Sequence, residues 1–76
     1  MTKEQTALQV IADLSQRPPD ELRPDMELVA DLEIDSPRAL QLLCDLEDRL
    51  SIEISDQDAA GMDTVGDILN YLAAIP

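Results

Sequence analysis

The sequence predicts an all-α protein, a small four-helix bundle with three main helices, one short third helix and a long loop between the first two helices. Three observations predict this fold. Apolar residues recur at spacings of three and four in three separate segments, which is the period of a helix with one buried face. The 76 residues suffice for one small hydrophobic core. The apolar side chains are almost all aliphatic, with Tyr71 the one aromatic residue.

The first helix is expected to start at Thr2. Thr2 and Gln5 have the spacing of a capping box, in which each side chain accepts a hydrogen bond from the other residue's backbone N–H. Pro18 and Pro19 should end the helix, because proline cannot continue the ladder of backbone hydrogen bonds. The residues expected to face the core are Ala7, Leu8, Val10, Ile11 and Leu14.

A long connection then runs from residue 17 to residue 35, stiffened in its first half by three prolines. Unstructured loops of this length are uncommon in compact domains. Apolar side chains can dock this loop on the bundle, and short helical turns are expected near residues 20–22 and 29–32. The docking residues are Leu22, Met26, Leu28, Leu32 and Ile34.

The second helix is expected to begin at Ser36 or Pro37, with Asp35 or Ser36 as its N-cap. A proline at the first helical position loses no hydrogen bond. Successive helical residues are about 100° apart, so one stripe should be buried: Ala39, Leu42, Leu43, Leu46 and Leu50.

Two further sides of this helix should face solvent. Asp45 and Arg49 are predicted to form an ion pair at the spacing i, i+4 on one of them. The other side carries a second stripe away from the core, with Glu47 at its edge: Pro37, Leu40, Gln41, Cys44 and Asp48.

The remainder of the chain predicts a linker and two helices. Residues 51–55 alternate like a strand but have no partner strand, so they are expected to form an extended linker anchored by Ile52 and Ile54. Ser55 or Asp56 could cap a short helix through Ala60, which Gly61 ends. Thr64 and Asp67 mark the start of the last helix, whose inner face should carry Val65, Ile68, Leu69, Leu72 and Ile75.

Charge and composition exclude several classes of function. Five basic and seventeen acidic side chains give a formal charge of -12, which repels nucleic acid and anionic membranes and favours basic protein partners. No histidine is present, so Ser-His-Asp and Cys-His catalysis are excluded, and the single cysteine permits no internal disulfide. We therefore expect no catalytic residues, no metal site and no enzyme activity.

Without a signal sequence or an apolar run long enough to span a membrane, a cytoplasmic location is expected.

The residues around Ser36 resemble those of the acyl and peptidyl carrier proteins. Asp35-Ser36 opens a leucine-rich helix after a loop that carries Leu28, Asp31 and Leu32, and the similarity covers roughly residues 8–72. The resemblance implies that residues 1–76 are a single acyl-carrier-like domain. It also implies that Ser36 carries 4′-phosphopantetheine from coenzyme A, with Asp35 in support.

The resemblance further implies how such a protein would work. A monomer would carry acyl intermediates as thioesters and present them to fatty-acid, polyketide or related synthase enzymes. Its partners would be a phosphopantetheinyl transferase and synthase and acyltransferase enzymes with basic docking patches. The partner-binding residues would be Pro37, Arg38, Leu40, Gln41, Cys44, Glu47 and Asp48. The helix bundle could part to shelter the acyl chain among residues such as Leu46, Ile54, Ile68 and Leu72.

Three positions depart from the family's pattern, and several alternatives stay open. Pro37 replaces the usual Leu or Met, Glu33 stands where Gly is usual, and Arg38 adds a positive charge. The chain could instead be a peptidyl or aminoacyl carrier, or an unmodified acidic adaptor that binds basic partners through its second helix. Ser36 could be only an N-cap, while Leu40 could pack under the loop and Cys44 could be a buried filler.

Overall fold

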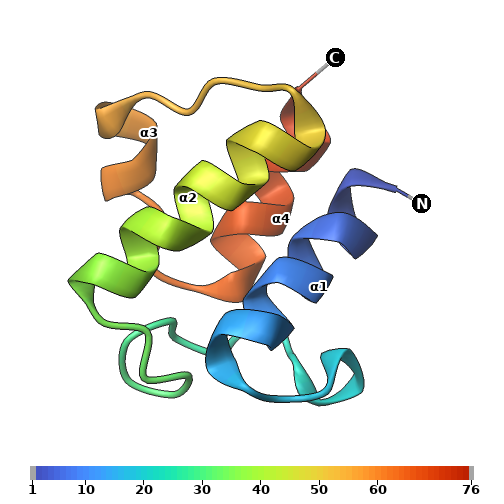
Figure 1. Cartoon of the computed structure of the whole chain (residues 1–76), viewed down its shortest axis with the longest axis vertical. Helices are drawn as coiled ribbons and strands as arrows, with labels where there is room; N and C mark the ends of the chain where they lie inside the picture. Colours follow the sequence, from blue (N-terminus) through green and yellow to red (C-terminus); the bar gives the residue numbers. More distant parts are fainter. Residues whose placement is uncertain (1, 76) are drawn as a thin grey trace.

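The structure, a computed structural model, describes residues 2–75 and contains the helices expected from the sequence. Helix α1 (Lys3–Ser15), α2 (Ser36–Leu50), α3 (Asp56–Ala60) and α4 (Val65–Ala74) follow in order, with a 3-10 turn η1 (Pro19–Glu21) after α1. Helix α1 packs against both α2 and α4, while the short α3 stands at the edge of the bundle (Figure 1). The all-α prediction is therefore confirmed. Within residues 2–75, no helix is long and apolar enough to cross a membrane.

Local capping signals set where the helices begin. The Thr2 hydroxyl accepts from the Gln5 N–H at 3.1 Å, and the Gln5 side chain accepts from the Thr2 N–H at 3.0 Å, which completes the predicted capping box. Thr64 and Asp67 form a second capping box at the start of α4, and Ser55 caps α3. All three helix starts agree with the prediction.

Helix α1 ends earlier than the two prolines require. Its last residue is Ser15, and Gln16 adopts the left-handed conformation with φ 58°. The N–H groups of Gln16 and Arg17 both donate to the Ala12 carbonyl, which satisfies the end of the helix before Pro18 is reached. The predicted stop at the prolines is thus two residues too late.

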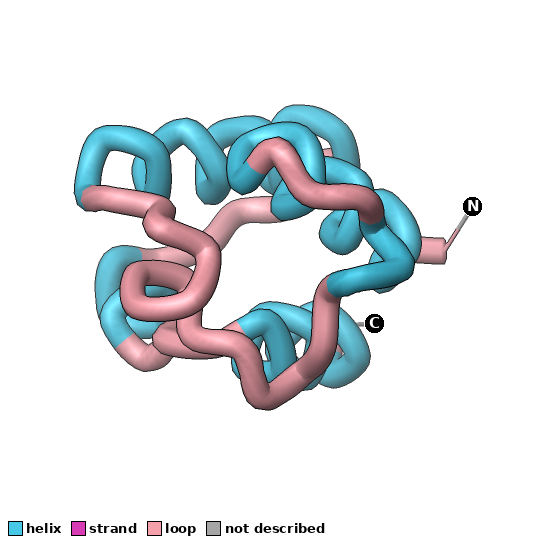
Figure 2. Tube along the Cα trace, turned by 90° about the horizontal axis from the view of Figure 1, so that it is seen from below, coloured by secondary structure: helices cyan, strands magenta, loops and turns pink. Residues whose placement is uncertain are grey.

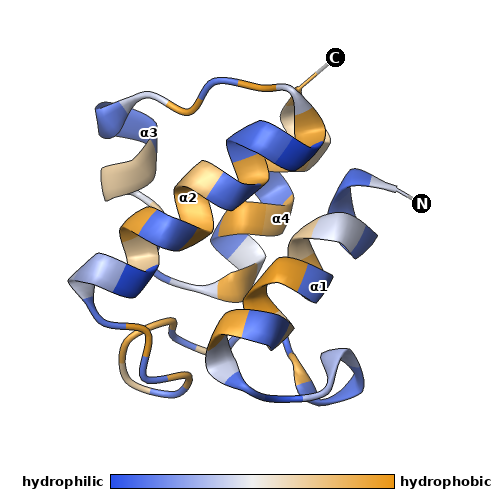
Figure 3. Ribbon diagram, in the orientation of Figure 1, coloured by the Kyte–Doolittle hydropathy of each residue, from blue (hydrophilic) through white to orange (hydrophobic). Residues whose placement is uncertain are grey.

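The core forms where the apolar stripes of α1, α2 and α4 meet (Figure 3). Three of the five predicted loop anchors are fully part of this core, and Leu22 and Met26 pack against it half-buried. On α2, Leu42 and Leu46 are buried, while Ala39, Leu43 and Leu50 are half-buried. The core residues are Ala7, Val10, Ile11, Leu28, Leu32, Ile34, Leu42, Leu46, Val65, Ile68 and Leu72.

The long loop is fastened to the start of α4 by backbone hydrogen bonds. The N–H of Leu28 donates to the Asp63 carbonyl at 2.9 Å, and the N–H of Val65 donates to the Met26 carbonyl at 3.0 Å. The Gly66 N–H donates to the Pro24 carbonyl at 2.9 Å. These bonds satisfy N–H groups that the first turn of α4 cannot pair internally. Figure 2 views the molecule from this end, with the loops in pink.

Helix α3 and the linker before it are attached through few contacts. Ile52 and Ile54 are half-buried and anchor the extended linker, as predicted. The Tyr71 hydroxyl donates to the Glu53 carbonyl at 3.3 Å, and α3 itself has no buried residue. Helix α3 is therefore the helix least fixed by the core.

The predicted ion pair on α2 is wrong. The Asp45 carboxylate instead accepts a hydrogen bond, at 2.9 Å, from the side chain of Gln41, which lies one turn earlier on the same side of the helix. An ion pair does form between Arg23 and Asp25, both exposed, at 3.6 Å.

Candidate functional site

Ser36 is the first residue of α2, and its side chain is exposed. The N-cap is Asp35, whose Oδ1 accepts from the Arg38 N–H at 3.1 Å. Within residues 2–75 the Ser36 hydroxyl makes no hydrogen bond. Capping is thus the work of Asp35, so the interpretation of Ser36 as only an N-cap is wrong and its hydroxyl stands free in solvent.

The first turn of α2 offers fewer backbone donors than a helix start usually does. Pro37 has no N–H, the Arg38 N–H is held by Asp35, and the Ala39 N–H donates to the Asp35 carbonyl at 2.8 Å. The Ser36 N–H is the one backbone donor left in this turn for an anion. The exposed Arg38 guanidinium, which has no partner in the described part of the chain, is the nearest positive charge in the sequence.

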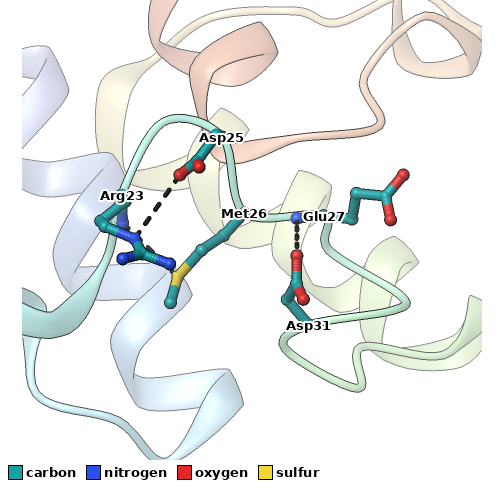
Figure 4. Close-up of polar contacts among 5 residues, drawn as sticks. All are labelled: Arg23, Asp25, Met26, Glu27 and Asp31. Carbon is teal, nitrogen blue, oxygen red and sulfur yellow. Dashed lines mark hydrogen bonds and ion pairs between the residues drawn. The ribbon is translucent and has the colours of Figure 1, made fainter.

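The turn that leads into Ser36 is held by its own polar contacts. The Asp31 carboxylate accepts from the Glu27 N–H at 2.7 Å (Figure 4). The Asp31 N–H in turn donates to the Glu27 carbonyl at 2.9 Å. The Arg17 side chain donates to the Asp31 carbonyl at 3.1 Å and so ties the turn to the end of α1. Earlier in the loop, Arg23 pairs with Asp25 in the same view. Asp31, one of the residues that carry the resemblance, therefore shapes the approach to Ser36.

Glu33 lies in this turn with a backbone conformation that residues other than glycine seldom adopt. Its φ is 57°, in the left-handed region where a glycine has no steric penalty. Its exposed carboxylate lies three residues before Ser36. The departure from glycine noted in the sequence therefore occurs at a position whose backbone favours glycine.

The second stripe of α2 is exposed, as predicted from helical spacing. Leu40 is 66% exposed, and Cys44 is exposed as well, so neither packs under the loop nor fills the core. Pro37, Arg38, Gln41 and Asp48 are also exposed.

Glu47 differs from its neighbours on this face. It is half-buried, and its carboxylate accepts from the Ile54 N–H at 2.9 Å. Glu47 therefore holds the linker after α2, and its carboxylate is less available to a partner than that of Asp48.

A groove and a small cavity lie beside Ser36. The groove has a volume of about 270 Å³, and its lining includes Ile34 and Ala39, which flank Ser36 in the sequence. A cavity of about 50 Å³ lies next to it, and the two share Leu28, Ala39 and Met62 as lining residues. The cavity is completed by Leu42, Leu43, Ala59 and Ile68.

The cavity can be compared with the residues expected to shelter an acyl chain. Of the four residues expected there, Ile68 lines this cavity; Leu46 and Leu72 lie in the core beside it, and Ile54 is half-buried against the core. Met62 and Ala59 also line the cavity, and the sequence does not indicate them because both fall around the short α3, where it has no regular apolar period. In the described part of the chain no three His, Cys, Asp or Glu side chains are grouped so that they could hold a metal ion.

Comparison with protein families and with curated proteins finds similarity over most of the chain. The family described as "Phosphopantetheine attachment site" matches residues 5–72. The meromycolate extension acyl carrier protein of Mycobacterium leprae is 34% identical over 64 residues, which cover 84% of this chain and 56% of that protein. The acyl carrier protein of Clostridium perfringens is 38% identical over 64 residues, covering 84% of both. The chain thus spans little more than half the length of the mycobacterial relative.

Solved structures agree with the sequence comparisons. A Mycobacterium tuberculosis protein assigned as an acyl carrier protein superposes with a TM-score of 0.85 and 32% identity, over 95% of this chain and 96% of that one. The helix order and the long loop before Ser36 are therefore shared with a known fold.

Proposed function

Since the chain belongs to the phosphopantetheine attachment site family, we propose that it is an acyl carrier protein whose Ser36 hydroxyl holds the prosthetic group. The group of this family is 4′-phosphopantetheine, which is bound covalently. One observation carries the assignment of Ser36: its hydroxyl is exposed at the first residue of α2 and makes no hydrogen bond in residues 2–75, because Asp35 does the capping.

The residues around Ser36 fit a phosphodiester at this position. The Ser36 N–H is unpaired and lies at the positive end of the α2 dipole, which favours an anion. Arg38 adds a guanidinium two residues away, and Asp35 keeps the first turn of α2 closed so that the hydroxyl stays in solvent. When attached, the group supplies a thiol on a flexible arm, to which an acyl chain binds as a thioester.

The groove beside Ser36 supports a sheltering role for the bundle. The small cavity behind it, of about 50 Å³, exceeds the roughly 30 Å³ share of one water molecule but is far below the roughly 150 Å³ that holds benzene. A sheltered acyl chain would therefore have to widen the cavity. Helix α3 and Met62 are the parts of its wall that can move at least cost, since α3 has no buried residue.

The exposed side of α2 supports docking of basic enzymes. Leu40 and Cys44 give an apolar strip, and Asp48 and the exposed carboxylates before Ser36 supply negative charge around it. We expect the transferase, and the synthase and acyltransferase enzymes, to meet this face with Lys and Arg side chains. An unmodified adaptor would use the same face, so only modification of Ser36 separates the two functions.

The test is enzymatic loading. The folded chain is incubated with coenzyme A and a broad-specificity phosphopantetheinyl transferase, and its intact mass is measured. We expect the gain of one phosphopantetheine unit, lost in Ser36→Ala and retained in Ser51→Gly, a matched change at an exposed serine whose φ of 54° suits glycine. An unchanged mass for the parent chain, or loading of Ser36→Ala, would contradict the proposal.

A further inference from the structure

We propose that the turn of residues 27–31 is a second contact surface for the phosphopantetheinyl transferase, on the side of Ser36 away from the α2 face. The inference rests on the proposed function, because it assumes that a transferase modifies Ser36. It assigns to this turn a part in recognition, where the sequence indicated only the residues of α2.

The position of Ser36 at the end of α2 places the preceding turn within reach of an enzyme that modifies it. Helix α2 has 15 residues and extends from Ser36 in one direction only, for about 22 Å. A specific interface covers about 800 Å² of each partner, which is a patch about 16 Å in radius. A patch of that size centred on the Ser36 hydroxyl covers the residues that precede it as well as the first turns of the helix that follows.

The surface on that side has the features of a docking site. Val29 is 70% exposed, and in the described chain it and Leu40 are the two large apolar side chains that stand out in solvent. Val29 and Ala30 line the groove of about 270 Å³, together with Ile34 and Ala39 on either side of Ser36 in the sequence. The groove can thus accept an apolar side chain from a partner next to the modified hydroxyl.

The charges around the groove indicate a basic partner. The exposed residues Glu27 and Asp63 also line it, and Asp31 lies in the same turn. No Lys or Arg lines the groove. A transferase with an apolar side chain flanked by Lys or Arg fits this surface by charge and by shape.

The turn is held by hydrogen bonds and by one buried side chain. Leu28 is buried and bonds to Asp63, the Asp31 carboxylate bonds to the Glu27 N–H, and Arg17 bonds to the Asp31 carbonyl. The backbone around Val29 thus already has its hydrogen bonds in the free chain, which lowers the cost of ordering it on binding.

The first test is the kinetics of loading with a purified broad-specificity phosphopantetheinyl transferase and coenzyme A. We expect Val29→Ser to lower kcat/KM about tenfold, and Ala73→Ser, which places the same polar residue at an exposed apolar position far along α4, to change it less than about twofold. Circular dichroism confirms that both variants are folded. If Val29→Ser loads as fast as Ala73→Ser, the inference is wrong, while Ser36 loading and the proposed function stand. If the parent chain is not loaded at all, both are wrong.

The second test separates charge from shape. Glu27→Gln with Asp63→Asn should lower kcat/KM at low salt more than Glu4→Gln with Asp13→Asn, which removes the same charge from α1. Titration of the 15N-labelled chain with the same transferase should shift the amide signals of residues 27–31 together with those of α2. Equal rates for the two double variants, or shifts confined to α2, would overturn the inference.

Discussion

At the scale of single residues, the site depends on a division of labour between Asp35 and Ser36. The carboxylate of Asp35 closes the first turn of α2, and this leaves the adjacent hydroxyl without an internal partner. The sequence predicted that one of the two would cap the helix but not which, because Asp and Ser are about equally good N-caps. The choice is set by where the chain enters the helix, which depends on the loop and not on either residue type.

Glu33 gives a prediction about stability. Its φ of 57° costs an L-residue roughly 1–2 kcal/mol, and glycine avoids this cost. Part of the gain is offset, because a glycine loses more conformational entropy when the chain folds. Glu33→Gly should therefore raise the free energy of unfolding by about 0.5–1 kcal/mol relative to Glu33→Ala, which removes the same charge but keeps the strain. Urea denaturation measures the difference. Equal stability of the two variants would show that this turn is not strained.

Asp67 gives a prediction about pH. Hydrogen bonds from the Asp63 N–H, and then from the Thr64 N–H, hold the pKa of its carboxyl below the ordinary value of 3.8, although burial opposes the shift. Because the pKa is lower in the folded state, the ionised cap stabilises the fold above the unfolded pKa. That stabilisation is lost as pH falls through the folded pKa.

The measurement compares the parent chain with Asp67→Ala. The difference in their free energies of unfolding should be largest near neutral pH and should shrink below about pH 4. Asp48→Ala, which removes an exposed carboxylate with no hydrogen bond in the described chain, serves as the control. A difference for Asp67→Ala that stays constant down to pH 3 would contradict the role of the ionised cap.

At the scale of elements, helix starts could be predicted from the sequence and long-range backbone contacts could not. Thr2, Ser55 and Thr64 cap the helices that their spacing indicated, since capping is decided within four residues. The bonds between the long loop and the start of α4 join residues about 40 apart in sequence, and backbone N–H and carbonyl groups have no signature in the residue types. The sequence placed Glu47 on the docking face and did not indicate its bond to Ile54. That bond depends on the path of the linker, which the residue types do not reveal.

The contact between the loop and α4 is tested at Gly66. A Cβ at this position would lie 2.9 Å from the Pro24 carbonyl oxygen and 3.2 Å from the Pro24 Cβ. Gly66→Ala should therefore lower the free energy of unfolding by about 1 kcal/mol or more, although alanine in a helix is normally favoured over glycine by about that amount.

Gly61→Ala is the matched control for this change. Its Cβ would meet only the Asp58 carbonyl oxygen, at an ordinary 3.6 Å, and its φ of -89° suits any residue. We expect little change in its thermal unfolding. Stabilisation by Gly66→Ala would mean that the loop does not approach α4 as closely as described.

At the scale of the whole molecule, negative charge dominates the electrostatics. The formal charge is -12, and the ion pair between Arg23 and Asp25 joins two side chains that are 71% and 80% exposed. Such an exposed pair contributes little, whereas repulsion among the acidic side chains opposes the compact state. The aliphatic core and the helix caps therefore supply most of the stability.

Salt should accordingly stabilise the protein. Raising potassium chloride from about 10 mM to about 200 mM shortens the screening length from roughly 30 Å to below 10 Å, so the midpoint of thermal unfolding should rise by several degrees. Differential scanning calorimetry measures the midpoint. A midpoint that falls with salt would mean that attractive pairs outweigh the repulsion.

The central claim is that the free hydroxyl of Ser36 carries the prosthetic arm. Its most direct test is the intact mass of the chain isolated from the cells that make it, followed by fragmentation of the peptide that contains Ser36. The account predicts a chain heavier by one phosphopantetheine unit, with the addition on Ser36. A chain of unmodified mass, or an addition on any other residue, would contradict it.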